Sequence, residues 1–331
     1  MKALVYTGEK NLDFIDYEDP IQKDDEELIK IDSVGICGSD MHAFLGHDER
    51  RPSPLILGHE PSGTILGGPN DGKKVAINPL VTCGTCRFCK VGKDNICVTR
   101  QIISMPPREG AFAEYLSMPK QNLVYIPENV SLDKACLAEP LACGWHSVRI
   151  AKERIESEIQ NLKCLVIGGG AIGIGSALAL KANGIKDIFL AEINSIRHNS
   201  INKACEMEVF NPKQKIPLKE GSVDLVIDGV GIRASREMAS QFVSPGGLIM
   251  HIGLGEAKEG LDIRRMTLQE ISFIGTYTYT SQDFKDTAKA IFEGRLGSLD
   301  WTEIRPLKDG QSCFNEILCG KSSSPKIILK P

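Results

Sequence analysis

Residues 35–60 gather side chains that bind metals and move protons. The segment opens with Gly-Ile-Cys-Gly-Ser-Asp-Met-His and, after a short variable stretch, closes with Gly-His-Glu. Its chemically active side chains are Cys37, Ser39, Asp40, His42, His59 and Glu60. A catalytic zinc keeps about three sulfur, nitrogen or oxygen ligands and one open position. We therefore expect a metal site made by Cys37, His59 and a glutamate, although a lone cysteine or histidine is more often a buried core residue.

A second group of cysteines follows the pattern C-x2-C-x2-C-x7-C. It consists of Cys83, Cys86, Cys89 and Cys97. Four thiolates at this spacing form a closed tetrahedral cage, which is typical of a structural zinc site. An iron–sulfur cluster and two disulfides are the alternatives. Zinc is favoured because the segment is a small Gly- and Lys-rich lobe that lacks a core and needs a metal to fold.

An acid further along the chain competes for the catalytic metal. Glu139 lies in the stretch Leu-Ala-Glu-Pro-Leu, just before a predicted helix. It either caps that helix or faces the metal, so Glu60 and Glu139 are alternative third ligands. Cys143 and His146 follow on the same helix and are interpreted as packing residues.

A glycine-rich loop predicts a dinucleotide site. An apolar strand over 163–167 runs into G-x-G-x-x-G, and an apolar helix follows over 174–183. Glu192 ends the next predicted strand, about 20 residues after the loop, which is the spacing of the acid that binds an adenosine ribose. Glycines allow close approach of a pyrophosphate to the helix N-terminus. The predicted coenzyme contacts are Gly168, Gly170, Ile172, Gly173, Glu192 and Arg197.

The elements that position these residues differ between two parts of the chain. Short strands broken by Gly-rich turns are predicted at 2–7, 12–15, 27–33, 62–67, 73–78, 110–115 and 123–127, as in a partly open antiparallel barrel. From 163 to 293, strands alternate with helices, which predicts a doubly wound parallel sheet of about six strands. Strands at 301–306 and 324–331 are expected to return to the first domain.

Composition restricts the class of protein. A chain of 331 residues is too long for one ordinary hydrophobic core, so two domains are expected. Its content of 42 % hydrophobic and 25 % charged residues is typical of a globular protein. A net charge of -4 without a basic block gives no support for binding nucleic acid or an acidic membrane. The sequence shows no signal peptide and no membrane-spanning run, and its eleven cysteines cluster as metal ligands do. We therefore expect a cytoplasmic protein.

Together these motifs resemble the zinc-containing medium-chain dehydrogenase family, in its alcohol- and sorbitol-dehydrogenase-like branch. The resemblance extends over essentially the whole chain. It implies a GroES-like catalytic domain from 1–140 and 281–331, and a Rossmann NAD-binding domain from 141–280, with the active site in the cleft between them. It also implies two Zn²⁺ per chain, one catalytic and one structural, and a homodimer or homotetramer.

The resemblance also implies a reaction. Zinc lowers the pKa of the substrate hydroxyl, and hydride passes from the substrate carbon to NAD. Ser39 takes the hydroxyl proton and His42 passes it to solvent through the coenzyme ribose. Asp40 either takes part in the site or caps the helix, and both alternatives stay open. The expected substrate is a secondary alcohol or polyol that is oxidised to its ketone or aldehyde.

The substrate remains open at this point. Polyol-oxidising members carry an arginine close to the position of Thr278, where this chain has only Thr and Tyr, which favours a smaller or more apolar alcohol. Phe44, Trp145 and Tyr277 are candidate pocket residues or core residues. The alternatives are a sugar-phosphate or threonine dehydrogenase, a zinc-free quinone or enone reductase, and a non-catalytic zinc- and dinucleotide-binding relative.

Overall fold

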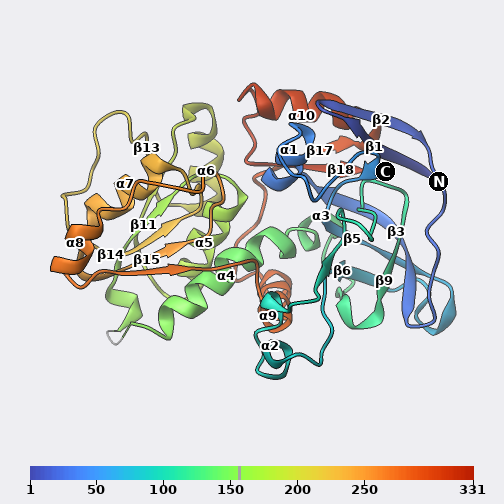
Figure 1. Cartoon of the computed structure of the whole chain (residues 1–331), viewed down its shortest axis with the longest axis horizontal. Coiled ribbons are helices and arrows are strands. Elements are labelled where there is room, and N and C mark those ends of the chain that lie inside the picture. Colours follow the sequence, from blue (N-terminus) through green and yellow to red (C-terminus); the bar gives the residue numbers. More distant parts are fainter. Residues whose placement is uncertain (156–157) are drawn as a thin grey trace. The chain divides into compact units, whose positions relative to one another are not determined.

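The computed structural model describes residues 1–155 and 158–331, which form two compact units (Figure 1). The first unit comprises Met1–Glu139, Thr280–Glu293 and Thr302–Pro331. The second comprises Pro140–Tyr279 and Gly294–Trp301. The sequence-based division put 294–301 with the first domain. The structure places this segment with the second unit, where Arg295 lies over the ring of Trp145.

The first unit is built on two sheets. A three-stranded sheet has the order β2 (Asn11–Asp16), β1 (Lys2–Gly8), β4 (Leu55–Ile56). A seven-stranded sheet has the order β10 (Leu123–Tyr125), β6 (Lys74–Ile77), β5 (Glu60–Leu66), β3 (Glu26–Gly35), β18 (Lys326–Lys330), β17 (Thr302–Pro306), with β9 (Tyr115–Pro119) also paired to β3. All pairs are antiparallel except β17 with β18. The predicted antiparallel strands of the first part of the chain and the return of the C-terminal strands are thus confirmed.

One predicted strand of this unit is wrong in its position. Residues 110–115 were expected to be extended, but β9 begins only at Tyr115. The backbone N–H groups of Gly110, Ala111 and Phe112 instead bond to carbonyls of the 56–58 segment. This places the Phe112 ring in the core, in edge contact with Phe314.

Short helices complete the first unit. They are α1 (Gly38–Phe44), α2 (Arg87–Lys90), α3 (Leu132–Ala135), α9 (Ser281–Phe292) and α10 (Gly310–Leu318), with 3-10 turns η1 (Gly68–Asn70), η2 (Asp94–Ile96), η3 (Lys120–Asn122) and η6 (Leu307–Asp309). A two-stranded ribbon, β7 (Leu80–Val81) with β8 (Gln101–Ile102), forms the base of the cysteine-rich lobe. The Asp94 carboxylate in η2 accepts the backbone N–H of Ser281, so the lobe is attached to the start of α9.

The second unit contains the predicted six-stranded parallel sheet. Its order is β13 (Glu208–Phe210), β12 (Asp187–Ala191), β11 (Lys163–Ile167), β14 (Val223–Asp228), β15 (Val243–His251), β16 (Ser272–Gly275). Its helices are α4 (Ala138–Lys152), α5 (Ala171–Ala182), α6 (His198–Cys205), α7 (Arg233–Phe242) and α8 (Ile263–Leu268), with 3-10 turns η4 (Ile159–Asn161) and η5 (Ser195–Arg197). The strand order reverses at β11, which is where such sheets bind ligands.

The sheet's strands follow from their apolar runs. Cys164–Ile167 of β11 are all buried, as expected for a strand covered on both faces. The strand predicted over 271–280 is shorter in the structure, because Thr278 has a φ of 45°, which extended backbone does not allow. None of the helices in the described residues combines the length and the apolar character that a membrane crossing requires.

Candidate functional site

Cys37, His59 and Glu60 come together as the first candidate metal group. Cys37 is the N-cap of α1, and Glu60 is the first residue of β5, directly after His59. The register of β3 with β5 pairs Gly35 with Glu60, which brings the two halves of the motif side by side. One ligand atom from each of the three side chains lies within 4.8 Å of the other two.

The glycines that frame this motif make room for it. A Cβ on Gly35 would lie 2.0 Å from Glu60 Oε2, so the carboxylate occupies the space that a side chain would fill. Gly58 has a φ of 88°, and a Cβ there would meet the Phe112 ring at 2.6 Å. Both positions therefore require glycine for the site to form.

Asp40 connects the two halves of the motif. It is fully buried, and its carboxylate accepts the backbone N–H of Cys37 at 3.0 Å and that of Gly58 at 3.3 Å. Its Oδ1 also lies 3.3 Å from Nδ1 of His59, which is an ion-pair distance without hydrogen-bond alignment. Asp40 thus both caps α1 and faces His59, as carboxylates behind metal-binding histidines do.

The charges around His59 favour a cation. Burial opposes the charged form of His59, but the Asp40 and Cys37 side chains outweigh it and hold the pKa well above its ordinary value. Burial likewise opposes ionisation of Asp40, and the neighbouring His59 and Arg51 nevertheless lower its pKa. A buried group of acids and a thiol that stabilises positive charge is chemically suited to a divalent metal.

Lys326 of β18 is a functional neighbour that the sequence analysis missed. Its Nζ donates to Glu60 Oε1 at 2.6 Å and to the carbonyl of Ile36 at 2.7 Å, and both charged side chains are buried. Among the described residues, Glu60 Oε2 has no hydrogen-bond partner. One carboxylate oxygen is therefore fixed by a cation, and the other is free to bind a metal. No spacing rule links position 326 to position 60, so the sequence carried no signal for this pair.

Glu139 lies near this group but outside it. It is the second residue of α4, it is buried, and its charge helps to raise the pKa of Lys326. Among the described residues, the metal-ligand group holds Glu60 and does not hold Glu139. Glu60 is therefore better placed than Glu139 to bind a metal directly.

Ser39 and His42 occupy different environments on α1. The Oγ of Ser39 lies 3.4 Å from Nε2 of His59, at the end of the helix next to Cys37. His42 lies in the last turn of α1 and is exposed. The pair therefore spans the distance from a half-buried hydroxyl to solvent along a single helix.

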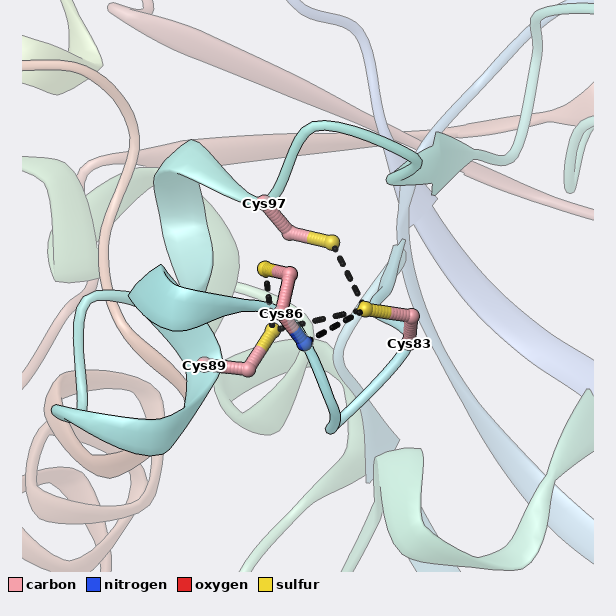
Figure 2. Close-up of side chains that lie close together, drawn as sticks. All are labelled: Cys83, Cys86, Cys89 and Cys97. Atoms are coloured by element: carbon pink, nitrogen blue, oxygen red, sulfur yellow. Dashed lines mark hydrogen bonds between the residues drawn. The ribbon is translucent and has the colours of Figure 1, made fainter.

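The four cysteines of the lobe form a compact cage (Figure 2). Their sulfurs lie 3.5 Å apart for Cys86 and Cys89, 3.5 Å for Cys97 and Cys83, and 3.9 Å for Cys83 and Cys89. A tetrahedron with Zn–S bonds of about 2.3 Å has edges of about 3.8 Å. All four thiols are free, which contradicts the disulfide alternative, and their spacing suits one tetrahedral ion.

The thiols of Cys83 and Cys89 in the cage differ in how readily they ionise. Hydrogen bonds from Thr85 and from the Cys86 N–H lower the pKa of Cys83 to about 5. Desolvation and the neighbouring thiols of Cys86 and Cys97 raise the pKa of Cys89 to about 12. Four negative sulfurs cannot coexist at these distances without a cation between them, so the donor set fits a metal.

The glycine loop after β11 has the geometry of a dinucleotide site. Gly168 has a φ of 99°, and a Cβ on Gly173 would lie 1.7 Å from the Gly168 carbonyl oxygen, so close helix–strand packing excludes any side chain there. Gly170 is the N-cap of α5, and apart from its chain neighbours no atom of the described residues lies within 4 Å of where its Cβ would be. Ile172, in the first turn of α5, is half-buried. The loop leaves open space at the helix N-terminus, as a pyrophosphate requires.

Glu192 is built into this loop. It follows β12, and its carboxylate accepts the backbone N–H of Gly169 at 2.7 Å and that of Asn194 at 2.6 Å. A carboxylate has about four acceptor positions, so it can also bind ribose hydroxyls. Arg197 ends the 3-10 turn η5 and thus lies before α6.

Of the candidate pocket residues, Phe44 is core, whereas Trp145 and Tyr277 are half-buried. Phe44 is fully buried, with its ring centroid 5.1 Å from that of Phe314, so it is a core residue and does not line a pocket. Cys143 and His146 are buried on α4, outside both metal groups, which agrees with a packing role.

Two family models match the chain. The model of the alcohol dehydrogenase GroES-like domain matches residues 23–128, and that of the zinc-binding dehydrogenases matches residues 171–293. The first covers both candidate metal groups, and the second begins at the first residue of α5.

Curated relatives and a solved structure agree with these matches. The L-galactonate-5-dehydrogenase of Escherichia coli is 30% identical over 89% of this chain and 88% of its own length. The sorbitol dehydrogenase of Bacillus subtilis is 30% identical over 85% and 83%. An Escherichia coli oxidoreductase of unknown specificity has a solved structure that superposes with a TM-score of 0.91 at 27% identity, over 99% of this chain and 98% of that one.

Proposed function

Because this chain belongs to the zinc-containing medium-chain dehydrogenase/reductase family, it is a zinc-dependent oxidoreductase acting on CH–OH groups, and we propose that its catalytic zinc is held by Cys37, His59 and a glutamate. The observation that carries this proposal is the group formed by a thiol, an imidazole and a carboxylate with one unpaired oxygen. Glu60 is the proposed direct ligand, with Glu139 acting beside it. The cage of Cys83, Cys86, Cys89 and Cys97 holds a second, structural zinc.

Two residues of α1, Ser39 and His42, carry the proton of the substrate hydroxyl away. When zinc is bound, it supplies Lewis-acid polarisation of the substrate oxygen. Asp40 faces Nδ1 of His59 and leaves Nε2 for the metal. Ser39 Oγ, next to that nitrogen, accepts the proton of the substrate hydroxyl as its own hydroxyl proton leaves toward His42, and the exposed His42 passes a proton to solvent.

The second unit binds NAD. The open N-terminus of α5 receives the pyrophosphate through the loop of Gly168, Gly170, Ile172 and Gly173. Glu192 accepts hydrogen bonds from the adenosine ribose, and Arg197 lies against the adenine side. In this assignment the unit of Met1–Glu139, Thr280–Glu293 and Thr302–Pro331 is the catalytic GroES-like domain, and the unit of Pro140–Tyr279 and Gly294–Trp301 is the NAD-binding domain.

The substrate is a small molecule with a secondary alcohol that is oxidised to a ketone. The names of the relatives point to polyols and sugar acids. The Thr- and Tyr-rich stretch at 276–280 lacks the arginine expected for a long polyol and favours smaller secondary alcohols. Sugar-phosphate and threonine oxidation have no supporting contact in the described residues.

A rate panel tests the proposed reaction. Polyols, sugar acids, small secondary alcohols, a sugar phosphate and threonine are offered with NAD, and NADH formation is followed in protein whose zinc content is known. We expect NADH formation with at least one secondary alcohol, and none after removal of the catalytic zinc. A protein that holds two zincs and NAD but oxidises nothing in the panel supports the non-catalytic alternative.

Coenzyme choice tests the assignment of Glu192. The 2′-phosphate of NADP would meet this buried carboxylate, so we expect NAD to be favoured by at least about a hundredfold in kcat/KM, near 3 kcal/mol. Glu192→Gln keeps an acceptor oxygen for the Gly169 N–H but removes the charge, and is expected to shrink the preference. Arg197→Ala is the control for a contribution of Arg197 to the coenzyme preference. Equal use of both coenzymes by the wild type would show that Arg197 binds the phosphate and that the Glu192 assignment is wrong.

The assembly and compartment are part of the same proposal. We propose a homodimer or homotetramer, as the family resemblance implies. We also propose that it functions in the reducing cytoplasm, since Cys83, Cys86, Cys89 and Cys97 gather as metal ligands rather than as disulfides. Light scattering of the zinc-loaded protein measures the assembly directly.

A further inference from the structure

Arg51 is a buried cation that is a member of neither metal-ligand group. Its residue is only 3% exposed. Its Nη1 donates to the Ser39 carbonyl at 2.6 Å, and its Nε donates to the Ser104 carbonyl at 3.0 Å. The same Nη1 lies 3.6 Å from Asp48 Oδ2, which supplies the opposite charge. One guanidinium thus connects α1, the loop after α1 and the segment that leaves the cysteine lobe.

The geometry of these contacts requires an arginine. A buried charge is tolerated only when its donors are paired, and here two nitrogens of one rigid fork reach carbonyls of two different segments. A lysine in this place ends in a single nitrogen, which cannot occupy the positions of Nη1 and Nε at the same time. Ser104 is fully buried with a φ of 65°, so its backbone sets one anchor point of the fork.

The other anchor point is the residue proposed to accept the substrate proton. Ser39 lies in the first turn of the seven-residue helix α1, too short to be rigid without outside partners. Asp40 fixes the backbone on the Cys37 side of this turn, through the Cys37 N–H. Arg51 fixes it on the Ser39 side. A shift of about 1 Å in a reacting group can cost about a hundredfold in rate, so this second anchor has catalytic consequences.

We propose that Arg51 is a positioning residue for alcohol oxidation, which holds the Ser39 backbone so that the Ser39 hydroxyl stays beside Nε2 of His59. This inference rests on the proposed role of Ser39. Arg51 itself touches neither metal ligand nor substrate in this role. Its effect on turnover passes through Ser39.

The neighbouring arginine provides a matched control. The side chain of Arg50 is 66% exposed and donates to the same Asp48 carboxylate at 2.8 and 2.9 Å. Arg50→Ala removes an equal charge one residue away and leaves the Ser39 anchor intact. Arg51→Lys keeps the charge and removes the fork, while Arg51→Ala removes both.

The first measurement is steady-state kinetics on the zinc-loaded enzyme with NAD and the best alcohol of the rate panel. We expect Arg51→Ala and Arg51→Lys to lower kcat by about 10- to 100-fold, with two zincs retained and the KM for NAD unchanged. Arg50→Ala is expected to match the wild type. Wild-type kcat in Arg51→Lys, or loss of zinc or of the folded state in both Arg51 variants, overturns the proposal.

A double-mutant cycle separates positioning from a general structural role. If Arg51 acts through the Ser39 hydroxyl, Arg51→Ala has little further effect in the Ser39→Ala background. If the losses in kcat from the two substitutions are additive, Arg51 does not act by positioning Ser39, and the proposed role of Ser39 as proton acceptor still holds. Full activity of Ser39→Ala alone instead refutes the proposed proton acceptor, which is a different failure.

Discussion

The two metal groups of the first unit reach their ligand sets by opposite routes. The cage takes all four sulfurs from one short stretch, and Cys83 is exposed. The open site takes Cys37 from the start of α1 and His59 and Glu60 from the start of β5, and it is stabilised by Lys326 from the far end of the chain. The cage is closed by local turns, whereas the open site depends on the folded sheet.

This difference predicts a stabilising role for the cage and a catalytic role for the open site. In the proposed assignment the cage would use every donor on one ion, and Asp94 attaches the lobe to α9, so a metal there would stabilise the structure. The open site surrounds three donors with additional charges from Asp40, Lys326 and the nearby Arg51. Such charges set the protonation and orientation of ligands, which a purely structural site does not need.

The largest effect is expected when one ligand is removed from each group in turn. Cys37→Ser is expected to lose about one zinc, keep its fold and lose at least about 10³ in activity, because the metal supplies several kcal/mol to the reaction. Cys86→Ser is expected to lose the other zinc and to unfold at a lower temperature, with turnover per folded molecule close to wild type. Elemental analysis, thermal unfolding and kcat measure this contrast.

The contrast fails in two recognisable ways. A Cys37→Ser protein that retains both zincs refutes the ligand assignment. A Cys86→Ser protein that is fully stable but inactive would mean that the roles of the two groups are exchanged.

The next effect concerns the proton path of the open site. Ser39→Ala is expected to keep both zincs and bind NAD but lose about 10² to 10⁴ in kcat, as is typical when a positioned proton acceptor is removed. His42→Ala is expected to lose less, because water or buffer reaches its exposed position. Adding a small amine or imidazole buffer is expected to restore part of the His42→Ala loss and none of the Ser39→Ala loss.

A smaller effect distinguishes the two glutamates. Glu60 belongs to the ligand group, so Glu60→Gln is expected to weaken catalytic zinc binding by about 100-fold or more, and Glu139→Gln by about 10-fold, as for a residue outside the ligand shell. Competition with a zinc-binding dye gives both affinities. The reverse order would make Glu139 the direct ligand and Glu60 mainly the partner of Lys326.

The smallest effect is kinetic and needs no mutation. Mild chelation is expected to remove zinc from the open site first, because three protein ligands leave a fourth coordination position that a chelator can occupy, while the closed cage retains its metal. Activity and zinc content are followed over time in the same sample. Simultaneous loss of both ions would show that the cage is not closed in solution.

Much of the molecule follows from short-range sequence patterns. The cage is determined by the spacing of its cysteines, because turns over a few residues already bring the sulfurs together. The glycine loop is equally local, since strand β11, the loop and α5 are consecutive and the packing of Gly173 on Gly168 is a contact within one turn. The alternating strands and helices of the second unit likewise predicted its parallel sheet.

Tertiary structure decided what the local patterns left open. Asp40 was ambiguous in the sequence, and the fold shows that it bonds the Gly58 N–H and faces His59 as well as capping α1. Phe44 was a candidate for the pocket and proved to be core, because α10 brings Phe314 against it. Lys326 and Arg51 carried no motif at all. Their roles arise from strand pairing and loop packing between distant residues, and pairing across such distances is determined by the burial of the whole sheet rather than by any spacing along the chain.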